Sequence, residues 1–165
     1  EVRAMQGPLA EALYGRLATH PDVARARPLL ALTALATADR ALAAERVVVT
    51  GTVPDVRPSL RRAVSVVATL REARGIQNKV LEAMAMGQPV VVAKGCGEAV
   101  DAVAERDLLL ADSVEEHVQQ INRLLESSER REAMGRAARL QVLARYSWDA
   151  HLSIIDAHLD AKARS

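Results

Sequence analysis

Short apolar segments alternate with amphipathic ones along most of the chain. The apolar runs are rich in β-branched residues and have few polar positions, which is typical of strands that are buried on both faces. The pattern predicts strands at 46–51, 63–70, 89–94 and 108–111, and it favours a strand over the start of a helix at 28–33. Strands of this kind, separated by helices, indicate a parallel sheet.

Helical periodicity fills the intervals between these strands. It predicts helices at 5–17, 36–45, 55–62, 79–86 and 98–104, with a loop at 95–97. Asp55 is suited to cap the helix at 55–62, because a carboxylate can accept the free N–H groups of a first turn. Gly87 is suited to end the helix at 79–86, because glycine tolerates the left-handed conformation found after many helices.

The C-terminal third has a helical pattern throughout. Ser113 and Glu116 form a capping box before a helix that ends near residue 125, and a second helix spans about 128–145. Ser147 caps a last helix with an apolar face formed by Trp148, Leu152, Ile155 and Leu159. Together these elements predict an α/β fold in one domain, residues 1–165. The fold is a Rossmann-like, doubly wound parallel sheet with helices on both faces and a helical C-terminal third.

Composition and charge exclude several classes of function. The formal net charge is +1, and no basic run is visible, so we expect no nucleic-acid partner. The longest apolar runs are too short to span a membrane. One cysteine, Cys96, cannot form an internal disulfide, which favours a reducing compartment and a cytoplasmic location. The chain begins at Glu1 with neither an initiator methionine nor an apolar leader, so we expect it to be a piece of a longer chain.

Candidate chemistry is concentrated in the loops after the predicted strands, because open parallel sheets bind ligands at the carboxyl ends of their strands. The chain has no GxGxxG, Walker, HExxH, CxxC or GxSxG motif. In the segment 71–91, Lys79 and Glu82 share one face near a helix N-terminus. A lysine there suits a phosphate and a carboxylate suits vicinal ribose hydroxyls, so the pair resembles a nucleotide cradle. The alternative is an ordinary solvent-exposed Lys–Glu pair.

The letters LEAMAMGQPVV at 81–91 resemble a segment of the retaining GT-B glycosyltransferases of group 1, family 4. The strings GTVPDVRP at 51–58, ARGIQNK at 73–79 and YSW at 146–148 are similar to one branch of that family. This branch comprises the bacterial exopolysaccharide sugar transferases of exosortase (PEP-CTERM) systems. The likeness extends from about Arg46 to Leu159, and residues 1–45 match poorly.

The resemblance implies the C-terminal, donor-binding domain of an enzyme that transfers a sugar from a nucleotide diphosphate-sugar. It implies that Glu82 holds the donor's ribose, that the segment Gly75–Lys79 approaches the diphosphate, and that the turn Gly51–Pro54 lies near the base. No metal or other cofactor is expected, because lysine, arginine and a helix N-terminus can stabilise the leaving diphosphate. The donor-binding residues expected on these grounds are Glu82, Lys79, Asn78, Gln77, Gly75, Arg74, Gly51, Val53 and Pro54.

The resemblance also implies an N-terminal acceptor domain that packs near the helix at Trp148, although Trp148 is equally suited to an ordinary core. We therefore expect the chain to be inactive alone and to approach a membrane only peripherally, through that other domain. Arg74 occupies the position of the family's first donor-binding carboxylate, and its Gly-Arg phosphate element is missing. Two alternatives remain: one half of a GT-B nucleotide-sugar epimerase, and a non-enzymatic interaction module on a degenerate domain.

Overall fold

Four parallel strands form the sheet in the computed structural model, which describes residues 29–32, 53–68, 78–150 and 152. The strands are β1 (Leu29–Leu32), β2 (Ala63–Ala68), β3 (Val90–Val92) and β4 (Leu109–Leu110), and they pair in the order β1-β2-β3-β4. Each neighbouring pair is parallel, as the sequence predicts. The predicted elements at 5–17, 36–45 and 46–51 lie outside the described residues.

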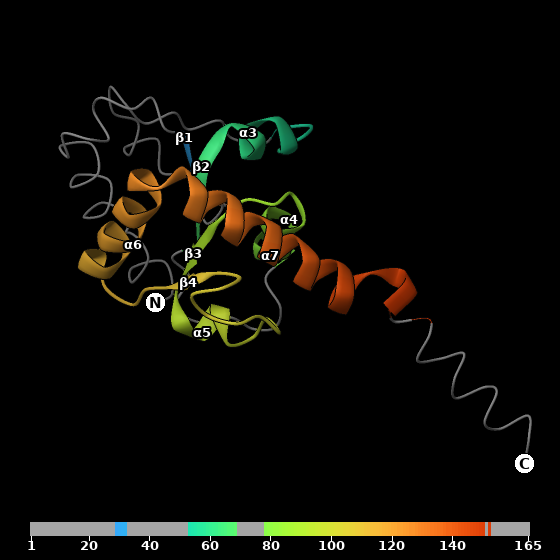
Figure 1. Ribbon diagram of the computed structural model, residues 1–165. Helices are drawn as coiled ribbons and strands as arrows, with labels where there is room; N and C mark the ends of the chain where they lie inside the picture. The colour runs from blue at the N-terminus through green and yellow to red at the C-terminus, as the bar shows by residue number, and fades with distance from the viewer. Residues whose placement is uncertain (1–28, 33–52, 69–77, 151, 153–165) are drawn as a thin grey trace, which may run out of the picture.

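The described helices cover both faces of this sheet (Figure 1). They are α3 (Arg57–Arg62), α4 (Asn78–Ala85), α5 (Lys94–Gly97), α6 (Val114–Glu126) and α7 (Ser128–Tyr146). Successive strand residues point to opposite faces. Val66 and Val90 therefore pack with Met84 of α4, whereas Val67 and Val91 pack with Ile121 of α6. These two apolar clusters confirm the α/β class with helices on both faces.

The end of α4 is formed as the sequence predicts. Gly87 has a φ of +70°, and its N–H donates to the Met84 carbonyl at 2.9 Å. The N–H of Gln88 donates to the Ala83 carbonyl at 3.0 Å, which completes the hydrogen-bond pair of a Schellman motif. The chain is thereby turned directly into Pro89 and β3, at the amino-terminal edge of the sheet. The start of α4 consequently lies toward the carboxyl-terminal edge.

Two details of the predicted helices are wrong. The loop expected at 95–97 is instead the short helix α5, and 98–104 is not a helix. Gly97 sits tightly in the core, where a Cβ would overlap the side chain of Leu110, so this glycine serves close packing within a helix. Cys96 beside it is buried, and burial raises the pKa of its thiol, which supports a packing role for this residue.

The caps of the helices largely follow the sequence. Ser113 accepts a hydrogen bond from the N–H of Glu116 at 3.1 Å, and Ser147 accepts one from Ala150 at 3.2 Å. Asp55, however, lies one residue before the N-cap of α3, which is Val56. Its carboxylate still accepts the N–H of Arg57 at 2.9 Å, so it satisfies the first turn from outside the helix.

The long helix α7 crosses α4 and continues beyond the body of the domain (Figure 1). Gly135 of α7 contacts Gly87 so closely that a Cβ on Gly135 would overlap the Gly87 carbonyl oxygen. After α7, Trp148 is 81% exposed, so it is not a core residue. Ile155 and Leu159 of the expected apolar face lie outside the described residues. No helix in the described part is long and apolar enough to cross a bilayer.

Candidate functional site

Three chain segments bring polar side chains to the carboxyl-terminal edge of the sheet. Helix α4 begins here with Asn78 and Lys79, on the segment that follows β2. Lys94 follows β3, and Asp112 follows β4. Because the strands are parallel and adjacent, these three segments meet at the same edge, which is where open α/β sheets bind ligands.

The first turns of α4 present the predicted polar residues to solvent. Val80, Ala83 and Met84 are buried against the sheet, whereas Lys79 and Glu82 are exposed. A spacing of three residues places Lys79 and Glu82 on neighbouring positions of the exposed face. Within the part of the chain that the structure describes, no hydrogen bond or ion pair engages the Glu82 carboxylate. Its oxygens are therefore accessible to hydroxyl donors from a ligand.

The other predicted site residues are only partly placed. Val53 is half-buried and Pro54 is exposed, and both precede α3. The structure records no contact that brings them to Glu82. The remaining candidates lie outside the described residues and stay predictions: Gly51, Arg74, Gly75 and Gln77.

A charged junction after β3 and β4 was missed by the sequence analysis. The Asp112 carboxylate accepts the backbone N–H of Lys94 at 3.0 Å, and its other oxygen lies 3.5 Å from the Lys94 ammonium. The N–H of Asp112 in turn donates to the Glu116 carboxylate at 2.7 Å. The capping box at Ser113 indicated a rigid helix start, but nothing local indicates that Asp112 reaches across to the neighbouring strand.

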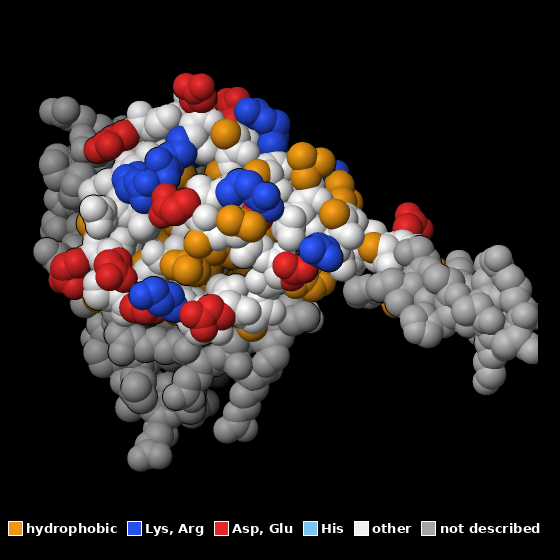
Figure 2. Space-filling model, turned by 60° about the horizontal axis from the view of Figure 1, so that its bottom comes forward, with side chains coloured by type: hydrophobic (Ala, Val, Ile, Leu, Met, Phe, Trp, Pro, Cys, Tyr) orange, Lys and Arg blue, Asp and Glu red, His pale blue; other side chains and the backbone are white. Residues whose placement is uncertain are grey.

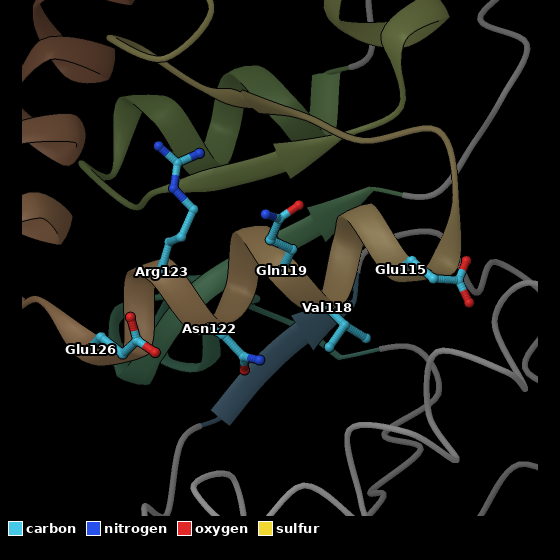
Figure 3. A pocket seen from close by; sticks show the side chains of 6 residues that line it. All are labelled: Glu115, Val118, Gln119, Asn122, Arg123 and Glu126. Carbon is cyan, nitrogen blue, oxygen red and sulfur yellow. The ribbon is translucent and has the colours of Figure 1, made fainter.

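A shallow hollow of about 440 Å³ lies along the outer face of α6, from its first turn near this edge to its last turn (Figure 3). It is lined by Glu115, Val118, Gln119, Asn122, Arg123 and Glu126. Its arginine is already held by the Glu105 carboxylate at 2.9 Å, and two of its lining residues are acidic. An anionic donor would be repelled there, so the carboxyl-terminal edge is the better candidate.

Three described carboxylates have lowered pKa values. The pKa of Asp55, beside the turn at Pro54, is lowered by hydrogen bonds from Arg57, and the other two carboxylates are Glu105 and Asp107. Hydrogen bonding to Arg123 lowers the pKa of Glu105, and Arg130 adds a second cation at 2.8 Å. Burial raises the pKa of Asp107, but hydrogen bonds from Arg106 and the Val103 N–H outweigh it, so the net pKa is lowered. Glu105 and Asp107 precede β4 and lie near the amino-terminal edge. They keep the ionised form and make structural ion pairs rather than acid or base chemistry.

The described residues form no metal-binding cluster, and the face drawn in Figure 2 has no patch of a single charge sign. No group of three or more histidine, cysteine or acidic side chains among the described residues could hold a metal ion. On the face seen in Figure 2, basic and acidic side chains are interspersed, with hydrophobic side chains between them. That face therefore has no continuous basic tract for a nucleic-acid backbone.

Comparison with known proteins gives one informative result. A family model described as "Glycosyl transferases group 1" matches residues 17–127, which include the sheet, α4 and all of α6. The match begins before the segment on which the sequence resemblance rests and ends before α7. A search of curated proteins found no match.

Proposed function

The chain belongs to the group 1 glycosyl transferases, and on that premise we propose that it binds a nucleotide diphosphate-sugar as the donor of a glycosyl transfer reaction. The observation that supports this most directly is the exposed pair Lys79 and Glu82 on the first turns of α4. The helix starts at the carboxyl-terminal edge of a parallel sheet, where this fold class binds its ligands.

Each group at this helix start suits one part of the donor. The Glu82 carboxylate can accept hydrogen bonds from both vicinal hydroxyls of a ribose. The N–H groups of the first turn of α4 and the Lys79 ammonium suit the diphosphate, which becomes the leaving group. Catalysis would then consist of positioning the donor and stabilising charge on the departing diphosphate, with no proton transfer assigned to Glu82 and no metal required.

The finer assignments follow the sequence resemblance. We propose a retaining transfer to a growing exopolysaccharide or another cell-surface glycan, in a bacterial cell. The acceptor would be held by a second domain docking near Trp148, whose exposure leaves it open to such a contact. By itself the chain should bind the donor without transferring its sugar. The thiol of Cys96 is compatible with the cytoplasm, and contact with the membrane would be peripheral, through the acceptor domain.

Calorimetric titration of the purified chain with UDP, GDP and ADP tests this function. At least one nucleoside diphosphate should bind, and Glu82→Ala should weaken that binding about 10- to 100-fold, because two hydrogen bonds to a charged group are lost. Glu132→Gln is the matched control, since it removes an exposed carboxylate from α7 at the opposite edge of the sheet. It should leave the affinity unchanged.

Two other outcomes would change the assignment. If the chain binds none of the three nucleotides, the interaction-module alternative replaces donor binding. If the chain together with its acceptor domain interconverts nucleotide-sugar isomers without an acceptor, the epimerase alternative is correct. Sugar transfer by the isolated chain would contradict the proposed division between two domains.

A further inference from the structure

The chain uses lysine sparingly, and the positions of its lysines are informative. Of the 22 Lys and Arg residues, only three are lysines: Lys79, Lys94 and Lys162. The structure describes the first two, and they follow neighbouring strands, β2 and β3, toward the same edge of the sheet. Nearly all basic residues of the chain are arginines, yet two of its three lysines lie at the candidate ligand-binding edge.

Lysine differs from arginine in ways that matter at this edge. An arginine fork is suited to fixed, bidentate contacts within the protein. Arg123 holds Glu105 in this way through two nitrogens, and Arg130 adds a single contact at 2.8 Å. A lysine ammonium is a compact charge with three rotatable donors, which can follow a phosphate that arrives and leaves.

The backbone of Lys94 is fixed by a hydrogen bond, whereas its ammonium is available to a ligand. Its backbone N–H is fixed to Asp112 at 3.0 Å, which sets where the side chain begins. Its ammonium lies 3.5 Å from the same carboxylate, and the two side chains are 60% and 47% exposed. An ion pair of this length and exposure is worth at most about 1 kcal/mol, so a multiply charged anion can displace it.

We propose that Lys94 is a second cation for the donor's diphosphate, held at the edge by Asp112 and acting together with Lys79. This assignment rests on the proposed function and extends it to a residue outside the segment 71–91. Asp112 serves as the resting counter-ion, which keeps the ammonium at the carboxyl-terminal edge until a diphosphate takes its place. Lys94 is therefore a binding residue for the charged part of the donor and contributes nothing to recognition of the base.

The experiment compares Lys94→Gln with the unaltered chain, using whichever of UDP, GDP or ADP binds, and the matching nucleoside as an uncharged probe. Lys94→Gln keeps the backbone bond to Asp112 and removes only the charge. It should weaken diphosphate binding about 10-fold and leave nucleoside binding unchanged. The difference should shrink as salt is raised, because a half-exposed charge is screened. Lys94→Arg should restore only part of the affinity, since it returns the charge but not the compact ammonium with its rotatable donors.

The control is Arg136→Gln, which removes one exposed positive charge from α7 and should leave the diphosphate affinity unchanged. If the unaltered chain binds a diphosphate and Lys94→Gln binds it equally well, Lys94 only links β3 to β4 and the inference is wrong while the proposed function stands. An equal loss for nucleoside and diphosphate would also overturn it, because that result indicates a structural effect. If no nucleotide binds the unaltered chain, the proposed function itself fails.

Discussion

The two edges of the sheet use charged residues in different ways. At the amino-terminal edge, Gly87 and Gly135 are in backbone contact, and the Asp107 carboxylate is buried with Arg106 as its partner. Arg139 also donates to the Ala85 carbonyl at 2.7 Å, which closes the end of α4. At the carboxyl-terminal edge, by contrast, the side chains of Glu82 and Lys94 are exposed and loosely held.

This contrast separates stability from binding. Polar groups that are buried and fully paired are costly to disturb, whereas exposed groups contribute little to folding and are available to a ligand. The amino-terminal edge, reinforced by α7, therefore holds the domain together, and the carboxyl-terminal edge is free to change its partners. Substitutions at the two edges should consequently have different effects on unfolding and on donor binding.

The largest effect on stability is expected for Gly135→Ala. The added Cβ would overlap the Gly87 carbonyl oxygen, and both sides of this contact are backbone, so α7 must shift. Overpacking of this kind should cost about 3 kcal/mol and lower the Tm in calorimetry by roughly 6–12 °C. Ala144→Gly, on the exposed face of the same helix, is the control and should cost about 1 kcal/mol. A rise in Tm for Gly135→Ala would show that the close contact does not exist.

Asp107→Ala should have the next largest effect. The substitution removes the acceptor of the Val103 N–H, which lies 2.8 Å from the carboxylate, and also the partner of Arg106. Leaving this N–H without an acceptor should cost about 2 kcal/mol in urea unfolding. Arg106→Ala should cost less, because the Arg106 side chain is 56% exposed and water replaces its partner. Equal costs for the two variants would contradict the assigned importance of the backbone bond.

Low pH should lower the free energy of unfolding through the carboxylates at the amino-terminal edge. Hydrogen bonding to Arg123 lowers the pKa of Glu105, and the pKa of Asp107 is also lowered in spite of its burial. A carboxyl group with a lower pKa in the folded than in the unfolded state stabilises the fold above its unfolded pKa. That stability is lost as the pH falls through the folded value. Unfolding free energies should therefore be level above about pH 5 and decline below about pH 4. Asp107→Asn should make this decline shallower.

The smallest effect on stability is expected at the carboxyl-terminal edge. Glu82→Gln changes an exposed side chain that no described residue engages, so the unfolding free energy should change by less than about 0.5 kcal/mol. The same variant should still weaken nucleotide binding, because the neutral amide is a poorer acceptor for two hydroxyls. A loss of stability above about 1 kcal/mol would indicate that Glu82 has a structural role and would remove the contrast between the edges.

Much of the described fold could be predicted from local patterns. The apolar runs correctly predicted β2 and β3, and Gly87 correctly predicted the end of α4, because both depend on residues close together in the chain. Predictions failed where distant packing outweighed local preference. Glycines 95 and 97 suggested a loop, but they lie in α5, where Gly97 leaves room for the side chain of Leu110. Trp148 is equally suited to a core or a surface by sequence, and the structure places it in solvent.

The candidate site also depends partly on local sequence patterns and partly on contacts between distant residues. The sequence by itself determined that Lys79 and Glu82 share a helix face, because a spacing of three residues requires it. It also determined the family resemblance, through the letters at 81–91. Only the tertiary structure decided that Glu82 is accessible and that Asp112, after β4, fixes Lys94 after β3. The physical reason is that helical periodicity acts over a few residues, whereas the pairing of β3 with β4 joins side chains that are 18 positions apart.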